Sequence, residues 1–282
     1  MQRQEVEDCF ATAVELVREA GKIVMEGFRS EKKVSKKTHA ADLVTGYDTR
    51  VEVFLISSLK RKYPSHQFIG EESSFAEGSP PALSDAPTWI IDPIDGTMNF
   101  VHGLPLVAVC VALAVNRKAV IGIVYNPVLE QLYTAVAGRG ALLNSEPIRV
   151  SSVTDMTKAL VNFWTVLPKS SNDSIPEVDY GLKNFLKRIT HGHLELGSCA
   201  VELCFVAAGS IDAFCVNLPN IGCWDLAAAA LIVQEAGGVL VDPETGGEFD
   251  MMKCRIFCAG TNELATSVLK EVNHFKCSTV PK

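Results

Sequence analysis

The stretch WIIDPIDGTMNF, residues 89–100, ends an apolar run on two aspartates three positions apart. Pro93 stiffens the step between Asp92 and Asp95, and a glycine and a threonine follow where a helix is expected to begin. Two carboxylates held about 4 Å apart repel each other by about 4 kcal/mol at an effective dielectric constant of about 20, and burial raises the cost. The pair is therefore expected to bind a proton or a cation.

Taken alone, this stretch has an ordinary alternative, because Asp before Pro and Asp before Gly are common in strand-ending turns. Two acids elsewhere favour the cation. Glu71 follows the strand-like run HQFIG, and Asp225 opens the apolar helical pattern DLAAAALIVQEAGG. Strands that end side by side would bring Glu71 to Asp92. Asp225 has the alternative role of a helix N-cap, which is compatible with binding a cation.

These candidate ligands are all carboxylates, with no histidine or cysteine among them. Such oxygen ligands favour Mg²⁺ or Mn²⁺ over zinc. Two ions that share Asp92 can hold a phosphate, one activating an attacking water and the other stabilising the leaving oxygen. The backbone amides of Gly96 and Thr97 would donate to the phosphate oxygens. The sequence therefore predicts metal-assisted hydrolysis of a phosphate monoester.

The chain has 282 residues, 48% of them hydrophobic, and a net charge of -7 at pH 7. This length allows one large domain or two closely joined halves, with a soft boundary near residue 150. The negative charge argues against a nucleic-acid partner. The nine cysteines form no CxxC pair, the amino terminus MQRQEVEDCF lacks a secretory signal, and the apolar run 104–115 is too short to span a bilayer. We expect a reduced, cytoplasmic protein without a membrane segment.

Hydrophobic periodicity predicts a mixed α/β chain. Amphipathic helices are expected at residues 5–28 and 48–62, with an exposed lysine-rich loop at 30–46 between them. Strand-like runs from 107 to 137 predict an antiparallel meander. The second half is expected to hold strands at 149–152, 159–165, 213–217, 239–242 and 256–260, and helices at 176–189, 198–209, 225–238 and from 262 onward.

Three motifs, in this order and spacing, resemble the inositol monophosphatase family of lithium-sensitive, magnesium-dependent phosphatases. They are GEES at 70–73, WIIDPIDGTMNFVH at 89–102 and WDLAAAALIVQEAGG at 224–238. ADLVTGYD at 41–48 is similar to the family's stretch upstream of the first metal ligand. The similarity runs from about residue 5 to 270, and the runs KYPSHQFIGEES and PTWIIDPIDGT point to the animal inositol-1-phosphate phosphatases.

The resemblance implies an α/β fold of the α+β kind, an αβαβα layered sandwich that usually forms a homodimer. Residues 1–282 would form a single domain, with a metal-site half at 1–150 and a substrate-side half at 151–282. The implied activity is hydrolysis of myo-inositol monophosphate to myo-inositol and phosphate, in inositol metabolism. Li⁺ would inhibit it by replacing Mg²⁺ at the second of two or three ion sites.

By the same resemblance, Glu71, Asp92 and the carbonyl of Ile94 would hold the first Mg²⁺. The second ion would bind Asp92, Asp95 and Asp225. Glu71 would also help to bind a weaker third ion.

The remaining site residues also follow from the resemblance. Thr97 and Asp48, together with Glu71, look like the catalytic residues, and the first two match the pair that orients the nucleophilic water. A hydroxyl suits this task because it accepts from water while it donates to a carboxylate. Lys37 matches a lysine of the loop near the third ion. The implied substrate-side residues are Asp95, Gly96, Thr97, Gly197, Ser198, Cys199 and Asp225.

One stretch departs from the family pattern. Members that take inositol phosphate have an acid a few residues before the tryptophan–aspartate motif, positioned for substrate hydroxyls. Here AFCVNLPNIGCWD has no acid between Asp212 and Asp225, and the stretch is about two residues longer. Asn217 or Asn220 is the candidate hydroxyl partner in its place.

This departure keeps two sister activities open, a 3'(2'),5'-bisphosphate nucleotidase and a sugar bisphosphatase. A metal- or inositol-phosphate-binding scaffold without turnover is the alternative from another class. The complete set of acids and the pair that orients the water argue against the scaffold, because a protein that does not catalyse needs no such pair.

Overall fold

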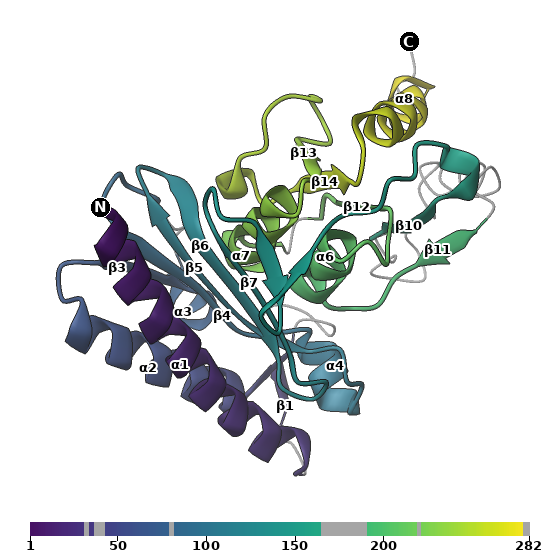
Figure 1. Ribbon diagram of the computed structural model, residues 1–282. Coiled ribbons are helices and arrows are strands. Elements are labelled where there is room, and N and C mark those ends of the chain that lie inside the picture. The colour runs from purple at the N-terminus through teal and green to yellow at the C-terminus, as the bar shows by residue number, and fades with distance from the viewer. Residues whose placement is uncertain (31–33, 37–42, 79–81, 165–190, 219–220, 279–282) are drawn as a thin grey trace.

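The computed structural model describes residues 1–30, 34–36, 43–78, 82–164, 191–218 and 221–278. Figure 1 shows its layers: helices α1 (Arg3–Phe28) and α2 (Gly46–Lys62), a first sheet, helices α6 (Cys199–Ala207) and α7 (Cys223–Glu235), a second sheet, and helix α8 (Asn262–Ser278). Three apolar clusters fill the spaces between these layers. The predicted αβαβα sandwich is confirmed.

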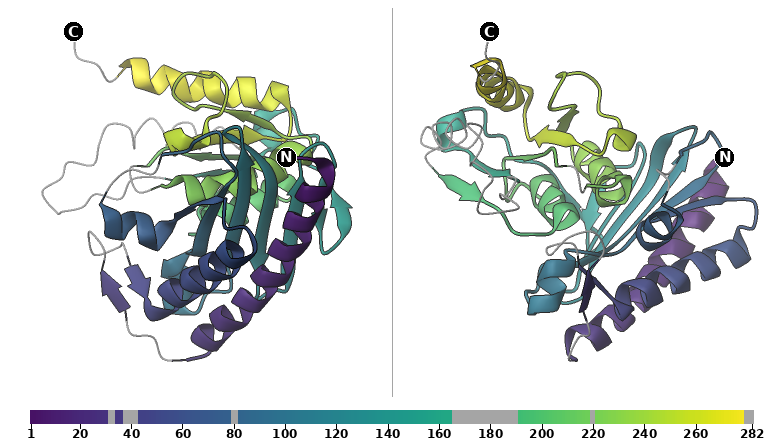
Figure 2. Two further views of the ribbon diagram at one scale, coloured as in Figure 1. Left: turned by 90° about the vertical axis from the view of Figure 1, so that its left-hand side faces the viewer. Right: turned by 180° about the vertical axis from the view of Figure 1, so that it is seen from behind.

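Helix α1 forms because its apolar residues recur every three or four positions on one face. That face is buried against α2 and the first sheet, and its members are Cys9, Ala13, Val17, Ala20 and Val24. Burial of a valine-sized side chain contributes about 1.5–3 kcal/mol, so this face anchors the outer layer. Both predicted amino-terminal helices are confirmed, and Figure 2 shows them crossing one face of the first sheet.

The first sheet has seven strands, whose order in space is their order along the chain. They are β3 (Gln67–Gly70), β4 (Thr88–Asp95), β5 (Ala108–Val115), β6 (Lys118–Asn126), β7 (Gln131–Val136), β8 (Ala141–Leu143) and β9 (Glu146–Ile148). β3 and β4 are parallel and all later neighbours are antiparallel, which confirms the meander. The strand expected at 149–152 is wrong, because the amide of Val150 donates to the carbonyl of Ala236 at the end of α7 instead of to a strand.

The second sheet has five strands in the order β11-β10-β12-β14-β13. They are β10 (Leu160–Phe163), β11 (Gly192–Leu194), β12 (Ala213–Val216), β13 (Val239–Val241) and β14 (Ile256–Ala259). β10 lies parallel to β11 and β12, and β14 runs antiparallel to β12 and β13. α8 covers the outer face through Leu264, Ala265 and Val268. The helix predicted at 176–189 lies outside the described residues.

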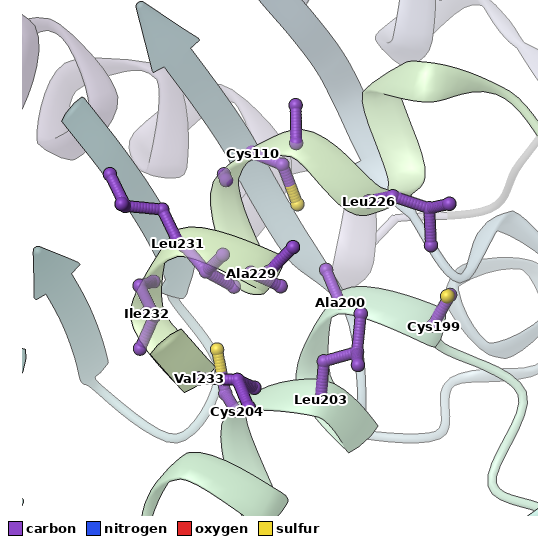
Figure 3. Packing of buried hydrophobic residues seen from close by; sticks show 14 of the residues in the cluster. Cys110, Cys199, Ala200, Leu203, Cys204, Leu226, Ala229, Leu231, Ile232 and Val233 are labelled. Carbon is purple, nitrogen blue, oxygen red and sulfur yellow. The ribbon is translucent and has the colours of Figure 1, made fainter. Parts of the chain in front are cut away.

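The two helices between the sheets, α6 and α7, are apolar almost all round because both of their sides are covered. Figure 3 shows side chains of α6 and α7 in one apolar cluster, together with Cys110 of β5. Cys199 and Cys204 of α6 are buried free thiols, and burial raises the pKa of each. The space between the two sheets is therefore an apolar core, in which α6 and α7 pack against the first sheet.

The lysine-rich segment at 30–46 is not wholly a loop. Strands β1 (Val34–Lys36) and β2 (Leu43–Thr45) pair in an antiparallel ribbon, with residue 35 opposite residue 44. Backbone hydrogen bonds make such a ribbon, so a polar composition does not prevent it. Lys37 lies outside the described residues. Within those residues, no helix is long and apolar enough to cross a membrane.

Candidate metal and phosphate site

The acids of the motif DPIDG are arranged by a bulge in β4. Asp92 and Asp95 are three positions apart, yet they pair with residues of β5 that are two positions apart. In a regular strand, side chains three positions apart point to opposite faces. The extra residue turns both carboxylates to the face covered by α6 and α7, while Ile94 points to the helices on the other face. Pro93 has no N–H, so it loses nothing where the pairing shifts.

Asp225 completes a cluster with these two acids. One oxygen from each of Asp92, Asp95 and Asp225 lies within 4.8 Å of the others. α7 begins at Cys223, so Asp225 is inside the first turn and is not the N-cap of its helix. Its Oδ2 accepts from the amide of Gly222 at 2.6 Å, the one half of a capping box that a glycine N-cap allows. A carboxylate has a second oxygen, so this capping leaves Asp225 able to bind a cation.

Glu71 reaches the cluster from the neighbouring strand. β3 runs parallel to β4, with Gly70 beside Ile91, and Glu71 is the first residue of α3 (Glu71–Glu77). The Glu71 side chain makes a hydrogen bond with Asp92, which contributes to the raised pKa of Asp92. The expectation that adjacent strand ends bring these acids together is confirmed.

The cluster is electrostatically costly without a cation. Burial raises the pKa of Asp92 well above its usual range, and the charges of Glu71, Asp95 and Asp225 raise it further. Burial also raises the pKa of Asp95 to about 6, although hydrogen bonds from Ser198 and three α6 amides oppose the shift. A divalent cation would reverse this effect, because it favours the ionised form of each acid. The donor chemistry and the raised pKa values therefore fit a hard cation such as Mg²⁺ or Mn²⁺.

The entry turn of α6 binds Asp95. The Ser198 hydroxyl donates to Asp95, and the amides of Cys199 and Ala200 donate to it at 3.2 and 2.9 Å. Ser198 is the N-cap residue of α6, but its side chain makes no capping hydrogen bond and is directed to Asp95. The turn therefore holds one of the three clustered carboxylates in place.

Two glycines let this turn approach β4. Gly96 has φ +84° and Gly197 has φ +79°, values that side chains disfavour. A Cβ on Gly96 would lie 2.9 Å from the carbonyl oxygen of Leu106 and 3.0 Å from the Cβ of Ser198. The end of β4 and the start of α6 are thus close-packed, with no room for a side chain on Gly96.

Thr97 and Asp48 lie together, as predicted. The Thr97 Oγ1 is 3.4 Å from Oδ1 of Asp48 and 3.1 Å from the carbonyl oxygen of Ile94. The other Asp48 oxygen accepts from the amide and hydroxyl of Thr45, at 2.8 and 2.5 Å, in a capping box that opens α2. Asp48 is fully buried, so the helix start fixes the carboxylate to which Thr97 donates.

Sequence reasoning missed Glu202. It is fully buried, and its carboxylate accepts from the amides of Leu196 and Ser198 at 3.1 and 3.3 Å and from the indole N–H of Trp164 at 3.1 Å. Burial raises its pKa to about 7. Glu202 is the one charged residue in SCAVELCFVAAG, and that isolation in an apolar helix was the available signal of a buried, hydrogen-bonded acid.

The altered segment before α7 is only partly described. Asn217 is exposed at the end of β12, and its side-chain amide donates to Oε1 of Glu244 at 3.1 Å. Glu244 also pairs with Arg255. Asn220 lies outside the described residues. The residue proposed as a hydroxyl partner is thus hydrogen-bonded to an acid from another loop.

A model of the inositol monophosphatase family matches residues 5–276. The chain belongs to the inositol monophosphatase family. Human inositol monophosphatase 1 is 46% identical over 269 residues, which cover 94% of each chain. A solved IMPase from Thermotoga maritima is 29% identical, covers 96% of this chain and 99% of its own, and has a TM-score of 0.82. SaIMPase-II solved with 2'-AMP is 25% identical over 96% of both chains, with a TM-score of 0.79. The inositol monophosphatase fold and the carboxylate cluster therefore occur together in this chain.

Proposed function

We propose that this inositol monophosphatase family member is a Mg²⁺-dependent phosphatase that converts myo-inositol monophosphate to myo-inositol and phosphate. The observation that carries the proposal is the convergence of Asp92, Asp95 and Asp225 within 4.8 Å. Relatives such as human inositol monophosphatase 1, which matches nearly the whole chain, support the choice of substrate.

In this proposal, Glu71, Asp92 and the Ile94 carbonyl hold the first Mg²⁺, and Asp92, Asp95 and Asp225 hold the second. Glu71 also contributes to a third ion, and Mn²⁺ is the alternative metal. When bound, these ions supply a water of lowered pKa and positive charge for the phosphate and the leaving oxygen.

Thr97 orients the water. Its hydroxyl donates its single proton to Asp48 or to the Ile94 carbonyl, and its oxygen is then left to accept from the water. This arrangement turns a lone pair of the water away from Thr97 and toward the phosphorus. Asp48 keeps its orientation because Thr45 binds its other oxygen. Thr97 and Asp48 thus fix the direction of attack.

The phosphate lies over the start of α4 (Thr97–His102) in this proposal, where the amides of Gly96 and Thr97 donate to its oxygens. Gly197, Ser198 and Cys199 line the opposite side. The amide of Cys199 and the hydroxyl of Ser198 already donate to Asp95, so these residues act on the site by holding Asp95 in place.

One observation favours a second candidate, hydrolysis of a nucleoside phosphate. Asn217 binds Glu244, and no acid stands between Asp212 and Asp225 to read inositol hydroxyls. The related SaIMPase-II has been solved with 2'-AMP bound. A 3'(2'),5'-bisphosphate nucleotidase activity is the corresponding alternative.

Phosphate release tests both candidates, with Mg²⁺ or a chelator. The substrates are inositol 1-phosphate, 2'-AMP, 3'-phosphoadenosine 5'-phosphate and fructose 1,6-bisphosphate at equal concentration, with Asp95→Asn as the inactive control. Magnesium-dependent release from inositol 1-phosphate above the others supports the proposal. Preference for an adenosine phosphate selects the second candidate. No release from any substrate by folded protein would point to a scaffold without turnover.

We further propose that residues 1–282 act as one domain, because elements from both sides of residue 150 share a core. We also propose that the protein is cytoplasmic, forms a homodimer and is inhibited by Li⁺. Exposed Met98 and Leu104, 40% and 53% accessible, support a self-association surface near α4. Light scattering of purified protein tests the homodimer, and a Li⁺ titration of activity tests the inhibition.

A further inference from the structure

Glu52 is a buried acid of α2 that the mechanism above does not use. Its side chain is only 4% exposed. Its Oε2 accepts from the amide of Glu72 and its Oε1 accepts from the amide of Ser73, both at 2.8 Å. Both oxygens of one carboxylate are thus bound to consecutive amides of a segment twenty residues further along the chain.

These two amides belong to the turn that carries Glu71. Pairing of β3 with β4 ends at Gly70, and α3 begins at Glu71. The first amides of a helix have no partner within the helix, so their direction depends on an outside acceptor. Glu52 is that acceptor at Glu72 and Ser73, and it fixes the backbone immediately after Glu71.

The approach of Glu52 requires glycine at position 70. A Cβ on Gly70 would lie 2.5 Å from Cδ of Glu52 and 2.6 Å from its Oε2. A side chain there would push the carboxylate away from the two amides. Gly70 and Glu52 therefore act together. The glycine leaves the space that the Glu52 carboxylate occupies beside the turn.

We propose that Glu52 is a positioning residue for the cation at Glu71. By holding the amides of Glu72 and Ser73, it fixes the direction in which Glu71 leaves the backbone and thus its distance from Asp92. Glu52 acts through the backbone of this turn and is not one of the proposed ligands, which are Glu71, Asp92, Asp95, Asp225 and the Ile94 carbonyl. The inference rests on the proposed metal site.

A merely structural role would stabilise α3 without changing cation affinity, and the chain offers a matched control for it. Glu235 of α7, which is partly buried, also uses both carboxylate oxygens, accepting from the amides of Gly138 and Gly140 at 2.7 and 2.8 Å. Glu235→Gln removes one of two amide acceptors, as Glu52→Gln does, but no proposed ligand lies on its turn.

The experiment measures Mn²⁺ binding to the metal-free protein, without substrate, from the electron paramagnetic resonance signal of free Mn²⁺. The proteins are wild type, Glu52→Gln, Gly70→Ala, the Glu52→Gln/Gly70→Ala double variant, Glu71→Gln and Glu235→Gln. We expect Glu52→Gln and Gly70→Ala each to weaken Mn²⁺ binding about tenfold, in the range typical of residues that support metal ligands. The double variant should bind Mn²⁺ no more weakly than whichever single variant has the lower Mn²⁺ affinity. Glu235→Gln should bind Mn²⁺ like wild type.

The outcomes separate this inference from the metal site on which it depends. If Glu71→Gln binds Mn²⁺ as wild type does, the assignment of Glu71 as a ligand fails. If Glu71→Gln binds weakly but Glu52→Gln and Gly70→Ala bind like wild type, the positioning role is overturned. Equal weakening in Glu235→Gln would also overturn it, because that result would report general loss of stability. Circular dichroism melting identifies any unfolded variant, and Gly70→Ala tests the role with Glu52 intact.

Discussion

Two turns of the site, residues 70–73 at the start of α3 and residues 196–200 at the start of α6, are each supported by a buried glutamate but in different ways. Glu52 holds the first turn from α2, an outer helix of the sandwich. Glu202 holds the second turn from within α6 itself, and that turn gives its own hydrogen bonds to Asp95. The difference teaches that the turn that carries Glu71 and the turn that binds Asp95 have separate supports. One turn can therefore change while the other is kept.

The largest effect should come from Asp92→Asn, which removes the carboxylate proposed to bind both ions and leaves the turn at residues 196–200 intact. We expect phosphate release to fall at least about 1000-fold, since the carboxylate shared by both ions is lost. The charges of Glu71, Asp95 and Asp225 raise the pKa of Asp92, so a neutral side chain relieves repulsion. The melting temperature in chelator should rise by about 2–4 °C per kcal/mol of relief. An active variant, or one that melts lower in chelator, would contradict this view.

Thr97→Ala should have the next largest effect, because it removes the group that orients the water and leaves all four acids in place. We expect a loss of about 100-fold in kcat, at the low end of the range for positioned proton-transfer groups. Mn²⁺ affinity should stay at the wild-type value. Thr97→Ser should restore most of the rate, and failure of that rescue would argue against a role of the hydroxyl.

Acid pH should weaken cation binding at the carboxylate cluster. The raised pKa values of Asp92 and Asp95, the latter about 6, mean that protons compete with the cation as pH falls through this range. We expect Mn²⁺ affinity to fall as the pH is lowered through about 6, by up to about tenfold per pH unit for each proton that the cation must displace. Calorimetry at pH 7.5, 6.5 and 5.5 in two buffers checks both the affinity and the proton release. Affinity independent of pH would contradict the cluster as the binding site.

Glu202→Gln should loosen the turn at residues 196–200, and its hold on Asp95, while it leaves the turn that carries Glu71 intact. One acceptor of the turn before α6 is lost, so Ser198 and the amides bound to Asp95 become less well ordered. We expect KM to rise about fivefold, equivalent to about 1 kcal/mol, a typical value for one hydrogen bond. Mn²⁺ binding should change less than it does in Glu52→Gln. If both glutamate variants weaken Mn²⁺ binding equally, the two supports are not separate.

The smallest effect should come from Asn217→Asp, which places an acid in the altered segment. Repulsion from Glu244 should replace the present hydrogen bond and free the new carboxylate. We expect the kcat/KM ratio for inositol 1-phosphate over 2'-AMP to rise about threefold, below the effect of one good hydrogen bond. Asn217→Ala is the control that removes the bond without adding an acid. An unchanged ratio would place the choice of substrate elsewhere.

Contiguous motifs made most of the fold and the acids predictable. The apolar stripe of α1, the meander and the apolar α7 follow from periodicity, which local backbone geometry imposes. The parallel ends of β3 and β4 made the meeting of Glu71 and Asp92 predictable. The short β1–β2 ribbon was missed because its pairing depends on backbone groups and leaves no apolar pattern.

The bulge in β4 shows where such reasoning ends. DPIDG predicts either a turn or a rigid pair of acids, but only the pairing with β5 shows that an extra residue turns both carboxylates to one face. Pro93 permits this shift, and the packing of β4 against β5 creates it.

The identity of the acids, the stiffness between them and the helix that follows are written in neighbouring residues, because covalent connection keeps those residues together. Glu52, Glu202 and the link from Asp95 to α6 were not readable in this way. Asp95 and the amide of Ala200 are 105 positions apart, and only the packing of α6 against the first sheet brings them to 2.9 Å. Burial of the apolar faces drives that packing, and it leaves each buried acid to find donors in whatever chain lies beside it.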